Sequence, residues 1–487
     1  MKKQAAAFLL IAILALGSLA GGTVYFRVNR GDLAIETETL YGDLRSAEGV
    51  TVTQYAALAS HLIWDTSWTP DAGSETESSW VMRKENSQVR RKALLKLYIS
   101  VYGTNMSWSG TDQAPLHGVE KEIFDDVVRG RESGSYTGRI RLNDYTDRWT
   151  VYADCVNVML ENEPDETAYS DLYDVSDIFS IPLDGDVWVL LQCEWSEYSG
   201  YFNIDMVEVN LNRFSRGVYA ADGNLYTAML VTDENGAQLD KSALPGGSWG
   251  VWRIPCSQVE HGDGRWWTED LTENLTARIE QAQPVYAFDE DADWMHMELS
   301  WDGEKLLVFT RAGGAFHMDV VDIRTGETLQ RLELLNDETA AALGAEPPSE
   351  YVSADVSLYE DFLVVRCIDT AILLEPAGEG YRLVTAVNLD AVPRSERWTE
   401  DYWLSMSEFR YAYDGERMCV LGIGSYVSHE DDYGGEPYWK VSGGFQQLSV
   451  YDTGGELLYS GMVDSQFNRY DYLDGVSVNF DLRAGSA

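Results

Sequence analysis

The chain is short of the residues that build metal centres and disulfide frameworks. Its 487 residues include 5 cysteines and 6 histidines. No two cysteines form a Cys-x-x-Cys pair, and no two histidines stand at an H-x-x-x-H spacing. The odd cysteine count argues against a full disulfide framework, and the wide spacing argues against a zinc site. Nothing in the cysteine usage requires an oxidising compartment.

Positive charge is also scarce. The chain carries 36 Lys and Arg against 80 Asp and Glu, which gives a formal net charge of −44 at pH 7. Such a surface repels nucleic-acid phosphates and anionic lipid headgroups, so we exclude nucleic acid as a partner. Much of the charge serves solubility, and the partners that it suits are cations and basic proteins.

Long apolar runs are confined to the N-terminus. Two lysines precede an uncharged run from Ala5 to Phe26, roughly 22 residues that reach about 33 Å as a helix. A cleaved secretory signal is the alternative, because Ser18-Leu19-Ala20 fits a small-x-small cleavage site. The run continues past that site, which favours an uncleaved anchor. We therefore expect a single-pass cell-membrane protein with a cytoplasmic tail at 1–4, a transmembrane anchor (or signal peptide) at 5–26 and an extracytoplasmic domain at 27–487.

Beyond that segment the chain consists largely of short apolar or alternating runs joined by turns. The clearest stretch runs from Met297 to Leu335, where turns at Trp301–Glu304, Gly313-Gly314 and Arg324–Glu327 separate four runs. This pattern predicts a four-stranded antiparallel meander. One meander cannot bury both of its faces, so it needs neighbours of the same kind. The layout recurs roughly every 50–60 residues, most clearly at 284–335, 351–390 and 404–463.

The sequence therefore predicts an all-β fold behind an N-terminal transmembrane helix. We expect a β-propeller of about seven four-stranded antiparallel blades, in a range of about six to eight. A last strand from Val476 to Leu482 is placed to complete a blade that begins near the N-terminus. Two other segments interrupt the strands: Pro70–Ser79, rich in Ser, Glu and Gly, predicts an exposed loop, and Asp270–Gln281 predicts a helix.

A family resemblance rests on the hairpin sequences. Leu299-Ser300-Trp301-Asp302-Gly303-Glu304-Lys305-Leu306-Leu307-Val308-Phe309 resembles the strand-turn-strand repeat of periplasmic TolB-like and quinoprotein-like β-propellers. Those repeats usually carry a proline before the Asp-Gly, and all three copies here lack it. The resemblance covers about three blades and implies the propeller fold. Because propellers host many unrelated functions, it implies no particular activity.

Two short matches to catalytic motifs fail the test of context. The segment Gly246–Gly250 fits G-x-S-x-G, but Pro245 precedes it and the pattern that follows is that of a strand, whereas a nucleophile elbow leads into a helix. The triplet Asp452-Thr453-Gly454 fits one half of an aspartic protease site, but the chain has no second copy to share a proton with it. Both segments are predicted to be turns, and no catalytic residue is assigned.

Three aspartates are candidate metal ligands. Asp289, Asp291 and Asp293 form D-x-D-x-D, the opening of many calcium loops, in which alternate side chains converge on one cation. The glycine and the glutamate expected further along such a loop are Trp294 and Ser300 here. A plain acidic connection between blades is the alternative interpretation. Calcium is the one cofactor that the sequence suggests.

The leading functional prediction is a non-catalytic binding or scaffold module at the cell envelope. Its partner would be a protein or a cell-envelope ligand, and its contact with the membrane would be the N-terminal helix. The alternative is an envelope glycan-acting enzyme that uses carboxylates and aromatic side chains in the central channel. A sensory ectodomain is the third hypothesis, although only about four residues precede the span, too few for a signalling domain.

Overall fold

The computed structural model describes residues 17–18, 35–58, 62–69, 73–80, 94–99, 107–111, 122–123, 126–127, 132–156, 158–160, 173–196, 201–207, 211–258, 275–349, 353–393, 402–431, 437–465 and 476–484. The predicted anchor at 5–26 lies outside these ranges apart from two residues. Within the described part of the chain, no helix is both long and apolar enough to span a bilayer. The chain divides into two compact units, unit 1 (Met1–Ser87 and Val384–Ala487) and unit 2 (Gln88–Leu383).

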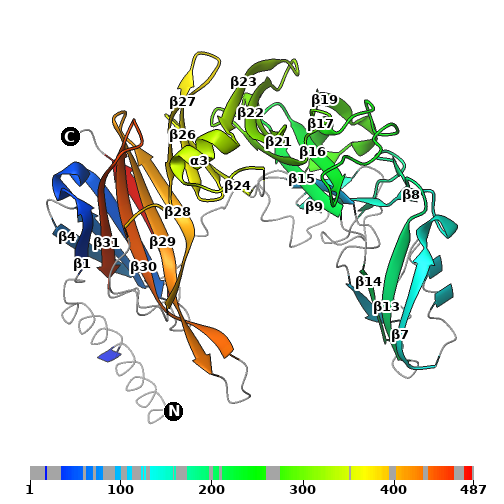
Figure 1. Cartoon of the computed structure of the whole chain (residues 1–487), viewed down its shortest axis with the longest axis horizontal. Helices are drawn as coiled ribbons and strands as arrows, with labels where there is room; N and C mark the ends of the chain where they lie inside the picture. Colours follow the sequence, from blue (N-terminus) through cyan, green and yellow to red (C-terminus); the bar gives the residue numbers. More distant parts are fainter. Residues whose placement is uncertain are drawn as a thin grey trace, which may run out of the picture. The chain divides into compact units, whose positions relative to one another are not determined.

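Unit 1 contains a five-stranded antiparallel sheet in the order β1-β31-β30-β29-β28 (Figure 1). Four of its strands follow one another along the chain as a meander. The N-terminal strand β1 then pairs with β31 as a fifth member. The bounds are β1 (Ile35–Gly42), β28 (Tyr402–Tyr413), β29 (Arg417–Asp431), β30 (Pro437–Asp452) and β31 (Leu457–Ser465).

The second sheet of unit 1 joins distant parts of the sequence. Its order is β32-β2-β3-β4, and β32 pairs with β2 in nine consecutive residue pairs from Val50–Ala484 to Leu58–Val476. The predicted last strand, which completes a sheet begun near the N-terminus, is thereby confirmed. The strands are β2 (Val50–Leu58), β3 (Leu62–Thr69), β4 (Gly73–Trp80) and β32 (Val476–Ala484), and the 3-10 helix η1 (Leu44–Ala47) precedes β2.

Two four-stranded meanders follow each other from β20 to β27, and the first lies where the turn pattern predicted it. In β21 the run Leu306–Phe309 is fully buried, because a strand inside a sheet with both faces covered has no solvent side. The bounds are β20 (Trp294–Leu299), β21 (Lys305–Ala312), β22 (Ala315–Asp322), β23 (Thr328–Leu335), α3 (Asp337–Leu343), β24 (Ala354–Leu358), β25 (Leu363–Cys367), β26 (Thr370–Ala377) and β27 (Gly380–Asn388).

The largest sheet of unit 2 has the order β10-β18-β17-β16-β15, and β19 also pairs with β17. Its pairs are antiparallel except for β10 with β18, which is parallel. The bounds are β10 (Val158–Leu160), β15 (Leu211–Tyr219), β16 (Asn224–Asp233), β17 (Gly250–Gln258), β18 (Leu275–Ala277), the 3-10 helix η3 (Ile279–Gln281) and β19 (Gln283–Ala287).

Three smaller sheets complete the described part of unit 2, in the orders β6-β14-β13-β7, β11-β9-β5 and β12-β8. The bounds are β5 (Leu94–Ile99), β6 (Ser107–Thr111), β7 (Gly134–Arg141), the 3-10 helix η2 (Leu142–Asp144), β8 (Arg148–Trp149), β9 (Val151–Val156), β11 (Tyr173–Asp174), β12 (Ile181–Pro182), β13 (Trp188–Ser196) and β14 (Tyr201–Val207).

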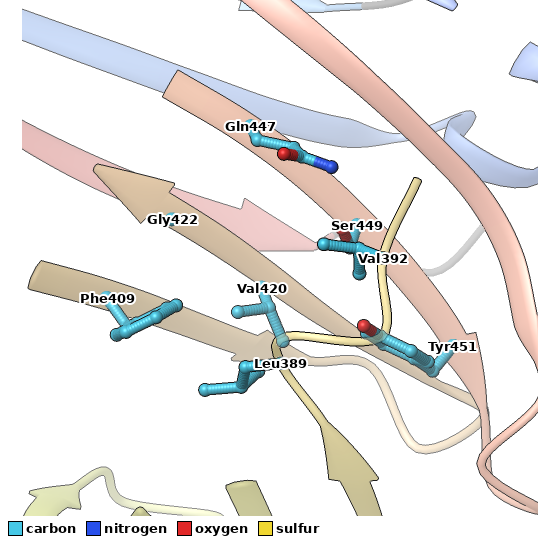
Figure 2. A pocket seen from close by; sticks show the side chains of 8 residues that line it. All are labelled: Leu389, Val392, Phe409, Val420, Gly422, Gln447, Ser449 and Tyr451. Atoms are coloured by element: carbon cyan, nitrogen blue, oxygen red, sulfur yellow. The ribbon is translucent and has the colours of Figure 1, made fainter. Parts of the chain in front are cut away.

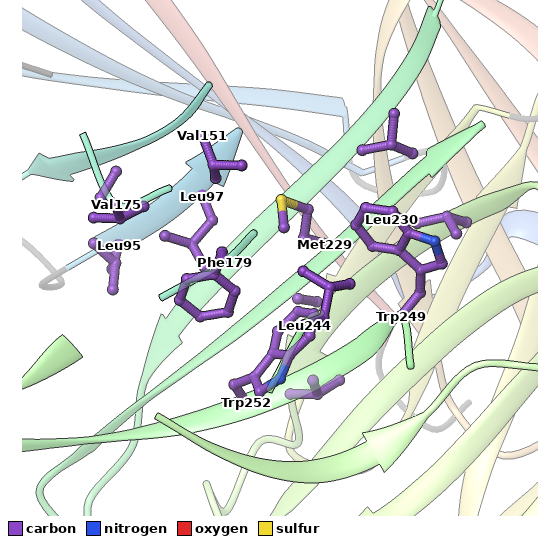
Figure 3. Packing of buried hydrophobic residues seen from close by; sticks show 14 of the residues in the cluster. Leu95, Leu97, Val151, Val175, Phe179, Met229, Leu230, Leu244, Trp249 and Trp252 are labelled. Atoms are coloured by element: carbon purple, nitrogen blue, oxygen red, sulfur yellow. The ribbon is translucent and has the colours of Figure 1, made fainter. Parts of the chain in front are cut away.

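The main core of unit 2 includes Trp249, which directly precedes β17, and Trp252, which lies on β17 (Figure 3). Trp252 packs edge-on against Phe179, with ring centroids 5.1 Å apart. Both indole N–H groups are satisfied, since Trp249 donates to the Leu239 carbonyl (3.0 Å) and Trp252 to the Pro245 carbonyl (2.8 Å). These large aromatic side chains are thus buried without leaving an N–H group unpaired.

Aspartates shape the hairpins. In six hairpin turns of the described ranges an aspartate Oδ1 accepts the backbone N–H two residues further on, at Asp222, Asp233, Asp302, Asp322, Asp414 and Asp452. This local bond fixes the turn and explains why the sequence signal for hairpins was strong. Part of the acidic excess is therefore structural.

Two expectations about single segments were wrong. The predicted loop at Pro70–Ser79 contains β4, a strand whose polar residues pair with β3 along its whole length. The predicted helix at Asp270–Gln281 contains strand β18 followed by η3. In β18, Leu275 and Ala277 are buried and Thr276 between them is only partly so, which is the two-residue alternation of a strand.

Candidate functional site

A group of polar and aromatic side chains lies where two sheets of unit 2 meet at their first strands. β15 is the terminal strand of its sheet, and β20 is the terminal strand of the next. Trp294, His296 and Glu298 alternate along β20 and therefore share one face. Arg216 of β15 reaches across to this strand. We call these four residues the edge-strand cluster.

An ion pair joins the two strands. The Arg216 guanidinium donates to Glu298 Oε1 and, through Nε, to the Met297 carbonyl at 3.4 Å. Glu298 is 17% exposed and Arg216 36%, so solvent still reaches the guanidinium. Burial alone would raise the pKa of Glu298, but His296 and Arg216 outweigh it and hold the pKa below its usual value. The carboxyl group is therefore an anion at neutral pH.

Aromatic rings hold His296 in place. The Trp294 ring stacks on the imidazole, with centroids 6.3 Å apart and planes 16° from parallel. Phe214 and Phe316 meet the Trp294 ring edge-on. His296 Nε2 lies 3.4 Å from Glu298 Oε1 and makes no hydrogen bond of normal geometry. The packed rings thus hold the imidazole with Nε2 directed at the Glu298 carboxylate.

The three predicted metal ligands lie in the turn between β19 and β20. Asp293 forms a two-pronged pair with Arg311 of β21, at 2.6 Å and 3.0 Å. Asp289 pairs with Arg331 of β23, and Asp291 is exposed. Two of the carboxylates thus meet arginines from different strands, and these pairs fasten the turn to the sheet.

Arg331 also belongs to a more deeply buried group. Its Nε lies 4.0 Å from Asp319, and the Tyr286 hydroxyl donates to the same carboxylate at 2.6 Å. Burial raises the pKa of Asp319, and the hydrogen bond from Tyr286 offsets part of that effect. Tyr286 is on β19 and Asp319 on β22, so this group joins two neighbouring sheets.

Within the described ranges, no group of three or more His, Cys, Asp or Glu is arranged to hold a metal ion. Calcium binding by Asp289, Asp291 and Asp293 therefore stays a prediction. The turn that contains them has other ties, because the Gln238 amide donates to the carbonyls of Asp289 and Ala292, both at 2.8 Å.

Two cavities among the described residues are relevant here, and both lie away from this cluster. One of about 140 Å³ in unit 2 is lined by Val127, residues 136–140 of β7, Leu191 and Cys193. It is smaller than the roughly 300–1,000 Å³ of typical ligand pockets. The other, of about 10 Å³, lies in unit 1 beside β28–β30 (Figure 2). Neither contains a residue of the edge-strand cluster or a predicted metal ligand.

The catalytic motifs set aside from the sequence are turns in the structure. Gly246 and Gly247 have φ values of +85° and +69° in the bend before β17, and no helix follows them. Asp452 and Gly454 form the hairpin between β30 and β31. The edge-strand cluster, in contrast, was not predicted. The sequence feature that could have indicated it is the placement of His296 and Glu298 at alternate positions of an otherwise apolar strand.

No family model matches the chain, and no curated protein matches it. Among solved structures, a putative 6-phosphogluconolactonase from Bacteroides uniformis gives a TM-score of 0.27 at 9% identity, over 89% of this chain and 100% of that one. TolB from Acinetobacter baumannii gives 0.20 at 8%, over 90% and 83%. An auxiliary nutrient binding protein from Bacteroides ovatus gives 0.22 at 6%, over 89% and 95%.

TolB, a β-propeller, is thus among the weak structural neighbours, as it is among the proteins that the hairpin sequences resemble, and no specific protein is identified. These TM-scores are low, and the strand pairing itself defines the fold. On that basis the chain is a nearly all-β protein built from many four-stranded antiparallel sheets.

Proposed function

We propose that the chain is a membrane-anchored extracytoplasmic β-propeller that binds a protein or cell-envelope ligand without catalysis. Successive four-stranded meanders and the sheet that β32 completes with β2 support the propeller. The apolar run from Ala5 to Phe26 supports the anchor, because its length matches the hydrocarbon thickness of a bilayer. Because propellers host binding and catalysis alike, the site must decide between them.

The edge-strand cluster is the observation that supports binding. It contains the Glu298 carboxylate, a hydrogen-bond acceptor, and the Arg216 guanidinium, a hydrogen-bond donor. Both lie on terminal strands, each of which has one edge without a paired strand in the described sheets. Packed rings hold it rigidly, and a pre-organised surface loses little entropy when a ligand docks. A carboxyl group with a lowered pKa stays ionised near neutral pH and is a poor general acid. The cluster therefore suits recognition of a ligand with complementary donors and acceptors.

Binding can be tested by site-specific photo-crosslinking in intact cells. A photoreactive phenylalanine analogue at Phe214 replaces a ring that contacts Trp294 with one of similar shape. We expect an adduct at this position and none at exposed Glu338 on α3. Adding Arg216→Gln should weaken the adduct severalfold. Equal labelling at both positions, or no effect of Arg216→Gln, would show that the cluster is not the binding surface.

The anchor is tested separately. The full chain should remain in the membrane fraction after a high-salt wash, leave it with detergent, and be cleaved by protease added outside intact cells. Its N-terminal peptide should retain Lys2 and Lys3. A mature chain that begins near Gly21 would instead identify a cleaved signal, without bearing on the binding surface.

A further inference from the structure

The small cavity of unit 1 has a built polar lining (Figure 2). It lies between one face of the sheet that contains β28–β31 and the segment 389–393, which follows β27. Apolar walls come from Leu389, Val392, Phe409 and Val420, and Gly422 leaves part of the wall open. The remaining lining residues are Gln447, Ser449 and Tyr451, which alternate along β30 and so point to the same side.

A chain of buried hydrogen bonds begins at Gln447. Its Nε2 donates to the Pro393 carbonyl at 3.0 Å and to Ser460 Oγ at 2.8 Å. Ser460 Oγ is in turn 3.3 Å from Ser449 Oγ. Because a carbonyl can only accept, the Pro393 contact fixes which end of the amide is the nitrogen. Gln447 Oε1 must therefore point away from these partners.

Gln447 Oε1 has no hydrogen-bond partner among the described residues. The Tyr451 hydroxyl makes no hydrogen bond of normal geometry there, and its one polar neighbour in the lining is the Ser449 hydroxyl. The two residues are only 2% and 4% exposed. Burial raises the pKa of Tyr451, although Ser449 offsets part of this effect, so the hydroxyl stays protonated and can donate. Buried polar atoms without partners are unfavourable, and a small molecule between them would remove the cost.

We propose that this cavity binds one water molecule, which donates to Gln447 Oε1 and accepts from the Tyr451 hydroxyl. The volume of about 10 Å³ is close to the minimum that holds one water and excludes anything larger. No charged side chain lines the cavity, so an ion would be poorly solvated there. The bound water completes the contacts of Gln447, which holds the segment 389–393 against the sheet through Pro393.

Whether Tyr451→Phe lowers or raises the melting temperature of the full chain tests this proposal. We expect Tyr451→Phe to lower the melting temperature by about 2–4 °C, since it strands the water. Tyr226→Phe is the matched control, because the Tyr226 hydroxyl has two partners, Asp222 Oδ2 at 2.8 Å and the Ile323 carbonyl at 3.0 Å. If the Tyr451 hydroxyl faces an empty void, removing it would raise the melting temperature while the control still lowers it, and the proposal would be wrong.

A second variant alters the same cavity from the neighbouring strand β29, on which Gly422 pairs directly with Gln447. Gly422→Ala adds a methyl group to the lining of this small cavity, so it should displace the water and lower the melting temperature. In a dry cavity the same methyl group would fill a void and raise it, which would contradict the proposal. A high-resolution crystal structure gives the direct answer. It should show a water within hydrogen-bond distance of both Gln447 Oε1 and the Tyr451 hydroxyl, and a water absent or bonded to only one of them would overturn the assignment.

Discussion

Gly217 on β15 lies directly beneath the Leu95 carbonyl of β5, and replacing it tests how two sheets of unit 2 are joined. A Cβ at Gly217 would collide with that carbonyl oxygen. The same oxygen accepts a hydrogen bond of 2.7 Å from Thr227 Oγ1, and Thr227 lies opposite Gly217 on β16. Glycine is therefore required here by close approach, since its φ is not in the left-handed region.

The cost of Gly217→Ala follows from these contacts. Forcing a methyl group into a packed interface costs about 1–3 kcal/mol. If β5 moves away, the buried Thr227 hydroxyl also loses its acceptor, which costs a further ~1–3 kcal/mol. Alanine returns about 0.5–1 kcal/mol because it restricts the unfolded chain. The net expectation is a destabilisation of roughly 3 kcal/mol, the middle of the combined range.

The assay is urea unfolding of the full chain together with hydrogen exchange of peptides from β5 and β15. Exchange should accelerate in β5 (Leu94–Ile99) in particular. Gly138→Ala on β7 is the matched control, since its φ is also outside the left-handed region and no atom lies within 4 Å of the added Cβ. It should stabilise by about 0.5–1 kcal/mol. If the two variants behave alike, or if β5 exchange is unchanged, the close-approach argument is refuted.

Three further predictions concern charge and strain. Backbone hydrogen bonds from Ala237 and Asn235 lower the pKa of Asp233 in the folded protein. The stability that Asp233 contributes is therefore present above its unfolded-state pKa and is lost as the pH falls through its folded-state pKa. Asp233→Asn should make the free energy of unfolding depend less on pH below about pH 4, and an unchanged pH dependence would contradict this. Ile368 has a φ of +55°, so Ile368→Gly should stabilise by up to about 1 kcal/mol in urea unfolding, and a clear loss would show that the backbone is not strained. If Asp289, Asp291 and Asp293 bind calcium, millimolar calcium should raise the melting temperature more than sodium chloride of equal ionic strength, and Asp291→Asn should abolish the difference; identical effects would show screening alone.

Much of the strand order could be predicted from the sequence because hairpin turns are local. The bond from Asp302 Oδ1 to the Glu304 N–H needs no distant residue, so an Asp-Gly pair between apolar runs predicts it directly. β4 and β18 could not be found in this way. Their strand character comes from pairing with β3 and with β17, and tertiary pairing overrides local composition.

The candidate site was less predictable than the fold. Asp289 and Asp293 were noticed for their spacing, but their arginine partners on β23 and β21 lie far away in the sequence. The edge-strand cluster depends on Arg216 and Glu298 meeting across two sheets. Composition and periodicity predict which face of a strand a residue occupies, whereas which strands become neighbours is set by long-range packing.

The pairing of β2 with β32 means that β2 is synthesised long before its partner strand. The chain from Leu58 to Val476 lies between these partners and includes the whole of unit 2. At roughly 5–20 residues per second, the ribosome needs about 20–80 s to cross that interval. A hairpin forms in about 1–10 μs, so β2 and β3 can pair long before β32 exists, and one edge of β2 then stays open. During that interval the open edge of β2 is exposed to pairing with other chains, and so is β1, whose partner β31 is also made late.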